Sequence, residues 1–368
     1  MGARSVIVNG SLAYAADGSA VVFYDKIMTQ TLSSSSNPYL RGAAILCLCL
    51  AVLASEPAGA VTRNELFQAT TGIAGRCDGG DSAAFQAAMK TVLVRVTGRR
   101  TADEDPGLAP LIANARRYVQ QCRSAPDNQL WVAFDGPAIE RWLTQNGQPL
   151  WGHERPTTLV LLAVQTGPQS GTIVTTEDSG ELKAAVDAAA WARGLPLLWP
   201  SAGELQRNRL DFAAVSGIAP TALAEIGRHI GGEGVLIGRA SGTSATANVR
   251  WIHLFQDRSN EYSGTLEGVN GAADLYAGMF AASGNLVPVD IEVTGVSDLR
   301  DYAGIEAYLE SLTFISHVSV ESLSGDTIRF RLSTRGGVES LQRALLLNGR
   351  LQPLAAGDSG IQRFQLHH

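Results

Sequence analysis

Two apolar stretches decide the fold: LVLLAV at residues 159–164 and GVLIGR at residues 234–239. Short runs of this kind, with no polar alternation, are typical of strands that are buried on both faces of a sheet. Helical periodicity follows the first stretch over residues 182–189 and precedes the second over residues 222–230. Because strands that alternate with helices pair in parallel, the sequence predicts a mixed sheet with flanking helices.

An antiparallel hairpin is expected at the edge of this sheet. Strand patterns at residues 246–255 and 261–267 are joined by the polar turn QDRSN at residues 256–260. Strands joined this directly pair with each other. A helix near residues 275–282 closes the unit, so the middle α/β domain is expected to span residues 156–284.

An N-terminal α/β domain is predicted over residues 61–152. Its clearest pattern is a run of apolar residues, three and four positions apart, that indicates one face of a helix. The expected elements are a helix capped by Ser82, a strand at 93–98, a helix at 108–122, a strand at 130–134, and a helix that starts at Asp135 and ends at Gly147.

The last part of the chain, residues 286–368, predicts a ferredoxin-like sandwich with the order β-α-β-β-α-β. The fold class is therefore α/β and α+β, in three small domains. The expected elements are strands at 289–293, 318–320 and 328–332, helices at 299–312 and 338–346, and a closing strand from residues 351–354 or 361–366.

A signal for export is predicted near the N-terminus. The run AAILCLCLAVLA at residues 43–54 is uncharged, and it is shorter than the roughly 20 residues of a membrane-spanning helix. Ala58 and Ala60 are small enough for a signal peptidase, so we predict cleavage after Ala60. The product is expected in the periplasm, without a stable transmembrane segment. A buried core helix and an uncleaved N-terminal anchor are the alternatives.

The start of the chain is also in question. About 40 residues precede the apolar run, more than a signal peptide usually allows. Met28 offers an internal start, and residues 28–60 then have ordinary signal-peptide length. We interpret residues 1–60 as the signal region, with residues 1–27 as a misassigned start.

Composition limits the classes of function. The formal net charge is −6, which disfavours a nucleic-acid partner, and the 45% share of hydrophobic residues disfavours a disordered chain. The glycine-rich string GGEGVLIG at residues 231–238 follows a helix and opens a strand, the reverse of a dinucleotide fingerprint. We interpret its first glycines as helix caps and expect no cofactor. No metal site is expected either, because the histidines lack ligand spacing.

The predicted export places the two remaining cysteines in an oxidising compartment. Cys77 and Cys122 remain after the predicted cleavage, and an isolated pair in such a compartment predicts a disulfide. Two free buried thiols are the alternative.

Two candidate binding residues lie in the distinctive string WGHERP at residues 151–156. Trp151 could anchor a contact between the first two domains, and Arg155 could bridge to a carboxylate. Clefts often form between domains, so a binding crevice is one interpretation. A linker pinned by an aromatic side chain is the other. His253 alternates with apolar residues on its expected strand, which favours a packed or rim histidine.

Six strings occur in an order that resembles the proteobacterial exported family catalogued as domain of unknown function 2066. The resemblance covers nearly the whole predicted mature chain. It implies an envelope protein with no established activity, so it supplies no catalytic residues. The strings are KTVLVRVTGRR (90–100), ARRYV (115–119), WVAFDGPAIERWLTQNGQPLWGHERP (131–156), RGLPLLWP (193–200), GVLIGR (234–239) and VTGVSDLRDYAGIEAYLESL (293–312).

We therefore expect a non-enzymatic envelope scaffold or assembly accessory that binds other envelope proteins. Such a protein predicts an apolar patch on its surface and no deep polar pocket. A small-ligand sensor that uses a crevice near Trp151 is one alternative. A hydrolase of unrecognised type is another, and it predicts a cleft with titratable groups of shifted pKa. The oligomeric state is not predicted.

Overall fold

The computed structural model describes most of the chain after residue 62. The signal region predicted over residues 1–60, with its apolar run, internal start and cleavage point, lies outside the described residues except for two short strands. β1 (Ala13–Tyr14) and β2 (Ala20–Val21) pair antiparallel. The chain divides into two compact units, residues 1–58 and 59–368, and everything below concerns the second. The described residues are 13–14, 20–21, 63–72, 76–78, 82–167, 170–217, 219–348, 350–355 and 361–367.

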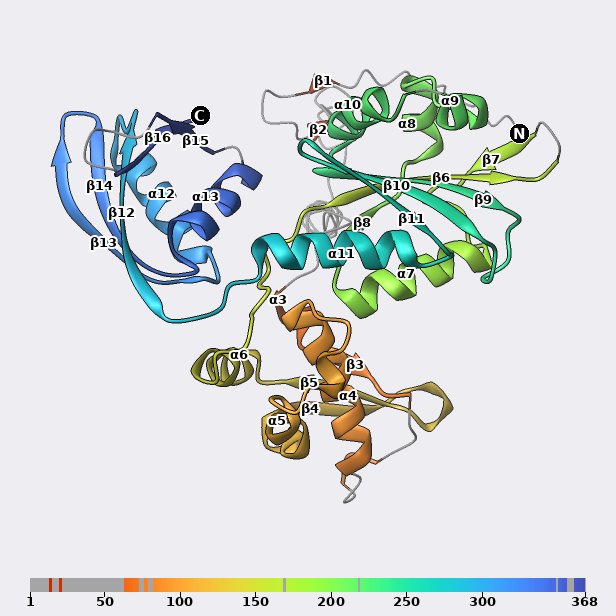
Figure 1. Ribbon diagram of the computed structural model, residues 1–368, viewed down its shortest axis with the longest axis horizontal. Coiled ribbons are helices and arrows are strands. Elements are labelled where there is room, and N and C mark those ends of the chain that lie inside the picture. Colours follow the sequence, from red (N-terminus) through yellow and green to blue (C-terminus); the bar gives the residue numbers. More distant parts are fainter. Residues whose placement is uncertain are drawn as a thin grey trace, which may run out of the picture. The chain divides into compact units, whose positions relative to one another are not determined.

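The middle sheet forms around the two apolar stretches that decide the fold (Figure 1). β6 (Thr158–Gln165) and β9 (Gly234–Ser241) pair in parallel along their whole length, which confirms the predicted pairing. The strand order is β11-β10-β9-β6-β7, and β8 pairs with β6. The remaining strands are β7 (Gly171–Ile173), β8 (Leu197–Leu198), β10 (Val249–Phe255) and β11 (Arg258–Ser263).

Helices cover both faces of this sheet, as the unbroken apolar strands require (Figure 1). Successive side chains of a strand point to opposite faces. Val160 and Leu162 share a core with α7 and α11, while Leu159 and Leu161 share a core with α8, α9 and α10. The helices are α7 (Glu181–Arg193), α8 (Ala202–Arg207), α9 (Phe212–Gly217), α10 (Pro220–Ile230) and α11 (Glu267–Phe280).

The predicted edge hairpin is confirmed, with a shorter turn than expected. β10 and β11 pair from Phe255↔Arg258 to Arg250↔Ser263, and β11 is the outermost strand. The predicted glycine cap of the helix before β9 is confirmed. Gly231 follows α10 with φ +105°, a left-handed conformation that glycine adopts without a steric penalty.

The N-terminal part of the unit contains a three-stranded sheet in the order β3-β5-β4. The expected strand at residue 130 and the expected helix after Asp135 are confirmed, and the Asp135 side chain accepts a hydrogen bond from the Ala138 N–H as an N-cap. The elements are α3 (Arg63–Leu66), β3 (Gln68–Thr70), α4 (Ser82–Thr97), η1 (Ala102–Glu104), α5 (Ala109–Ala113), η2 (Ala115–Tyr118), β4 (Val119–Ser124), η3 (Pro126–Asn128), β5 (Leu130–Phe134) and α6 (Gly136–Gln145).

Two predictions in this part are wrong. The strand expected at residues 93–98 is the end of α4, because Leu93 and Val96 continue the buried helical face of Ala88 and Met89. The helix expected at residues 108–122 breaks up after α5, and its last residues form β4. Pairing of β4 with β5 overrides the helical periodicity there, since the ladder satisfies the same backbone groups.

The C-terminal part contains five strands in the order β13-β14-β12-β16-β15, packed on two helices. The expected β-α-β-β-α-β order is present, and a fifth strand is added because both candidate closing segments form strands. β16 lies between β12 and β15 and pairs with β12 in parallel. The elements are β12 (Leu286–Thr294), α12 (Leu299–Ser311), β13 (Ile315–Ser324), β14 (Thr327–Arg335), α13 (Gly337–Asn348), β15 (Leu351–Leu354) and β16 (Gln362–Leu366).

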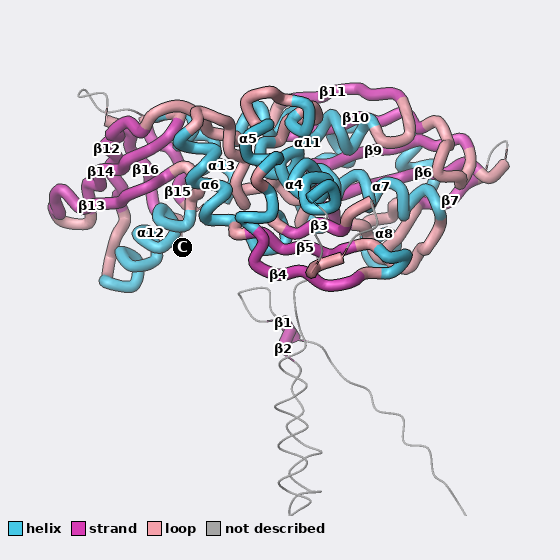
Figure 2. Tube along the Cα trace, turned by 90° about the horizontal axis from the view of Figure 1, so that it is seen from below, coloured by secondary structure: helices cyan, strands magenta, loops and turns pink. Residues whose placement is uncertain are grey.

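Helices and strands thus mix throughout residues 59–368, which confirms the α/β and α+β class. Figure 2 shows the same three groups of strands with helices beside each. The division into three domains stays a prediction, because residues 59–368 form one compact unit. In the described part of the chain, no helix is both long enough and apolar enough to span a membrane.

Candidate functional site

The candidate site is built around the linker string at residues 151–156, which joins α6 to β6. Trp151 is fully buried, and its backbone N–H donates to the carbonyl of Val96 at 2.7 Å. The Arg155 guanidinium lies over the Trp151 ring, 3.8 Å from the ring centroid. The structure therefore brings the two predicted residues together and ties them to the end of α4.

Arg155 is buried, and all three nitrogens of its guanidinium donate hydrogen bonds to backbone carbonyl oxygens. The predicted bridge from Arg155 to a carboxylate is wrong in this respect, because every hydrogen bond found for it among the described residues ends on a carbonyl. The acceptors are the carbonyls of Gly152 (2.7 Å), Trp151 (2.7 Å), Arg95 (3.0 Å), Arg193 (3.2 Å) and Gly194 (2.8 Å).

Three of these carbonyls, those of Arg95, Arg193 and Gly194, belong to the carboxyl ends of α4 and α7, where helix backbones leave acceptors unsatisfied, and the other two belong to the linker. A cation is favoured there by the negative end of each helix dipole. Burial lowers the pKa of Arg155 well below its ordinary value, and the neighbouring charge of Arg95 lowers it further. Arg155 thus joins two helix ends and the linker at one point.

Gly194 gives Arg155 the room it needs. This residue follows α7 with φ +63°, in the left-handed region. A Cβ at Gly194 would collide with the side chains of both Arg95 and Arg155. Glycine is therefore required twice at this position, for its backbone conformation and for its missing side chain.

A second buried arginine, Arg95, performs a similar task inside the N-terminal part. Its Nη1 donates to the carbonyls of Glu65 (2.9 Å), Leu66 (3.3 Å) and Gln68 (2.8 Å), which fixes the segment between α3 and β3. Burial lowers the pKa of Arg95 to about 10, so the side chain is still charged at neutral pH.

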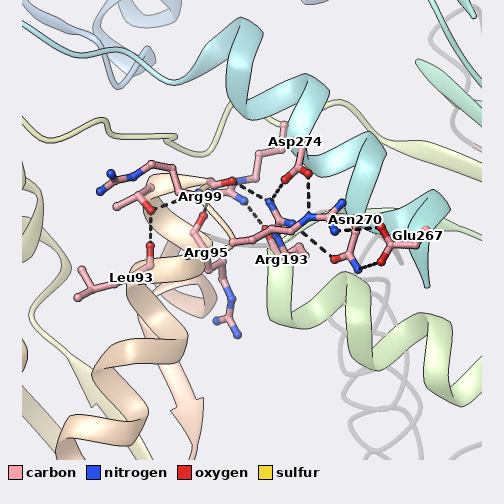
Figure 3. Close-up of polar contacts among 11 residues, drawn as sticks. Leu93, Arg95, Arg99, Arg193, Glu267, Asn270 and Asp274 are labelled. Carbon is pink, nitrogen blue, oxygen red and sulfur yellow. Dashed lines mark hydrogen bonds and ion pairs between the residues drawn. The ribbon is translucent and has the colours of Figure 1, made fainter. Parts of the chain in front are cut away.

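A charged network continues from this point to α11 (Figure 3). Arg193 donates to the Gly98 carbonyl at 2.7 Å and to Asp274 Oδ1 at 2.6 Å. Arg100 contacts Asp274 Oδ2 at 2.8 Å and Glu267 Oε2 at 2.9 Å. Carboxylates of α11 therefore bind Arg193 of α7 and Arg100, which lies just after α4.

A cleft of about 450 Å³ lies beside Arg155, toward α12 and α13. His153 Nδ1 lies 2.9 Å from the Thr313 hydroxyl, and Glu154 accepts a hydrogen bond from the Thr313 N–H. Burial raises the pKa of Glu233, which accepts from the Thr157 N–H at 2.8 Å. The arrangement can hold a small polar molecule. The lining residues are His153, Glu154, Arg155, Glu233, Tyr308, Ser311, Leu312 and Ala344.

Sequence reasoning finds Trp151 and Arg155 but misses Arg95 and Arg193. Arg95 lies inside the apolar string LVRV, and an arginine within an apolar run is a signal for a buried, structurally used cation. Arg193 has no such signal, because it lies in the polar end of an ordinary amphipathic helix.

The two cysteines predicted to form a disulfide lie at disulfide-bonding distance. Their sulfur atoms are 2.01 Å apart, and the pair connects Cys77 to Cys122 on β4. Both residues pack against the core of the N-terminal part. This pair anchors a segment that precedes α4 to the sheet.

His253 is buried, as the packed alternative predicts. Its Nε2 lies 2.9 Å from the Tyr276 hydroxyl, which lies 3.1 Å from the Thr158 hydroxyl. All three residues are fully shielded from solvent, and His253 Nδ1 has no hydrogen-bond partner in the described part of the chain. Burial lowers the pKa of His253 to about 4. The chain of three polar groups therefore contains a neutral histidine at neutral pH.

Acidification is expected to destabilise the protein through His253. The unfolded histidine titrates near pH 6.5 and the folded one near pH 4, so below pH 6.5 the unfolded state binds more protons. The contribution of His253 to the free energy of unfolding is fully present above this pH and falls by about 2.5 kcal/mol by pH 4.5. Urea unfolding of the parent and of His253→Gln at pH 7.5 and 4.5 measures this difference. The exposed His317→Gln variant is the control, and an equal pH response in both variants contradicts the assignment.

Comparison with known proteins finds one match. Residues 60–152 match a family model described as a domain of unknown function (DUF8605). No curated protein and no solved structure matches the chain. The match supports an uncharacterised domain at residues 60–152, and it is a different family from the one whose resemblance is described above. It ends at Gly152, so it includes Trp151 and stops before Arg155.

Proposed function

We propose that this chain is a non-enzymatic, exported binding protein of the bacterial cell envelope, a scaffold or assembly accessory for other envelope proteins. One observation carries the proposal: large apolar side chains that are exposed concentrate in the C-terminal part. Isolated exposed apolar residues are ordinary, but a concentration of them favours a protein-binding surface. Six of the seven found in the described residues lie there, namely Leu286, Val287, Leu299, Val320, Leu323 and Leu354, and the seventh is Trp191.

Strand β13 is the best-supported part of this surface. Val320 is 44% exposed and Leu323 is 67% exposed, and both lie on β13. Among the described residues β13 pairs with β14 alone, so it is an edge of the five-stranded sheet. An edge strand offers backbone donors and acceptors to an extended segment of another chain. We infer that the partner contributes such a segment, with apolar side chains over Val320 and Leu323.

Export is supported by features outside this surface. The apolar run at residues 43–54 fits a signal peptide, and the cysteine pair at disulfide-bonding distance fits an oxidising compartment such as the periplasm. The resemblance to the exported family catalogued as domain of unknown function 2066 supports the same location.

Affinity capture from crosslinked cells tests the proposal. The parent chain is expected to recover a defined envelope protein, and Val320→Ser/Leu323→Ser is expected to reduce that recovery about tenfold, since apolar anchors dominate binding energy. Ser322→Ala/Ser324→Ala, two exposed positions on the same strand, is the matched control. Equal recovery by both double variants, or no partner with the parent, would overturn the proposal.

A small-ligand sensor is the second candidate, and the polar cleft beside Arg155 favours it. Its lining combines a histidine and two carboxylates with a buried arginine, which suits a small polar molecule. A hydrolase of unrecognised type is the third candidate, and we assign it no residues.

A further inference from the structure

A hollow of about 310 Å³ opens at the carboxyl ends of β6 and β9. After β6 the chain forms β7 and passes through α7 to β8, and both strands pair with one edge of β6. It then passes through α8, α9 and α10 to β9, which pairs with the other edge of β6. The boundary between β6 and β9 is therefore a topological switch point, where open α/β sheets bind ligands. The lining residues are Ala163, Gln165, Phe212, Ser216, Arg239, Ala240, Ser241, Asn248 and Arg250.

Two arginines from neighbouring strands meet at this hollow. Arg239 on β9 and Arg250 on β10 are direct partners in the antiparallel ladder, so both side chains project from the same face of the sheet. Like charges placed directly opposite each other destabilise a sheet. The pair also lines a second hollow of about 410 Å³, so both arginines border open space on two sides.

Neither arginine is neutralised by a carboxylate in the part of the chain that the structure describes. Arg239 Nη2 contacts the Val215 carbonyl at 3.4 Å, while its Nε is buried with no hydrogen-bond partner. Glu261 lines the second hollow, but it forms no ion pair with Arg250.

Arginines on the C-terminal sheet show the contrast. Arg329 contacts Glu292 at 2.6 Å, and Arg331 contacts Asp290 at 2.9 Å. Both of these guanidinium groups have a carboxylate from a neighbouring strand. Arg239 and Arg250 also lie opposite each other on neighbouring strands, but neither forms an ion pair with a carboxylate among the described residues.

We propose that Arg239 and Arg250 bind the phosphate group of a small molecule. Two guanidinium groups match the roughly −1.5 to −2 charge of a phosphate monoester at neutral pH better than the single charge of a carboxylate. The hydroxyls of Ser216 and Ser241 and the amide of Asn248 line the same hollow and supply neutral hydrogen-bond donors. The site is on a different sheet from β13, so it stands independently of the proposed protein partner.

Calorimetric titration of the purified chain with inorganic phosphate at low ionic strength tests the site. Saturable binding is expected, weakened about tenfold in Arg250→Gln and in Arg239→Gln. Arg250 is exposed, so its variant is expected to fold even if Arg239→Gln does not. The matched control is Arg258→Gln, an exposed arginine on β11 of the same sheet that lines neither hollow.

Three outcomes would overturn the assignment. The first is no saturable binding of phosphate by the parent chain. The second is an equal loss in Arg258→Gln, which indicates general attraction by surface charge. The third is equal or tighter binding of acetate, or binding to phosphatidylglycerol vesicles without binding of free phosphate, which indicates a carboxylate or a lipid surface as the ligand.

Discussion

Replacing Arg155 with methionine is expected to lower the free energy of unfolding by about 4 kcal/mol. The buried guanidinium satisfies five carbonyls at the ends of α4, at the end of α7 and in the linker. Methionine fills part of the volume but donates no hydrogen bond, and each buried acceptor left unpaired costs about 1–3 kcal/mol before local relaxation. Urea unfolding followed by tryptophan fluorescence measures the loss, because the Trp151 ring lies under the guanidinium.

Two further variants isolate the cause. Arg155→Lys keeps the positive charge but loses the planar fork, so most of the loss is expected to remain. Arg141→Met removes an exposed arginine from α6 and is expected to change stability by less than about 0.5 kcal/mol. If Arg155→Met unfolds at the same urea concentration as the parent, other donors satisfy these carbonyls and the assigned role is wrong.

The sequence predicts the middle sheet well because the apolar runs, the helical periodicity beside them and the glycines that end the helices all indicate the same arrangement. The apolar run at residues 159–164 has no polar alternation, and the structure buries it on both faces. Residues 93–98 carry the same kind of signal, yet they end a helix. A short run of β-branched and apolar residues suits both conformations, and only packing on the other parts of the core decides between them.

The candidate sites likewise depend on contacts between residues that are far apart in the sequence. The string at residues 151–156 marks Arg155, but its acceptors at Arg193 and Arg95 are 38 and 60 positions away. Only the tertiary fold brings those helix ends together. Arg239 and Arg250 depend in the same way on the register between β9 and β10. A hairpin can be predicted from its turn. The pairing register of two strands can be predicted only where buried and exposed residues alternate regularly along them.

Loss of the link between Cys77 and Cys122 is expected to cost about 4 kcal/mol of unfolding free energy. The two cysteines are 45 positions apart, and a cross-link that closes a loop of this size removes much of the freedom of the unfolded chain. Thermal unfolding of Cys77→Ser/Cys122→Ser against the oxidised parent measures the loss. The intact parent should also gain the mass of two hydrogen atoms on reduction.

The reductant supplies the control for this prediction. Treatment with dithiothreitol is expected to lower the stability of the parent to that of the double variant and to leave the double variant unchanged. A loss in the double variant that the reduced parent does not show would indicate damaged packing by serine, since both cysteines contact the N-terminal core. Equal stability of the oxidised and reduced parent, with no gain of mass on reduction, would show that the two sulfur atoms are not bonded in the protein. That result would also remove one of the supports for an oxidising compartment, because the periplasmic proposal relies in part on this pair.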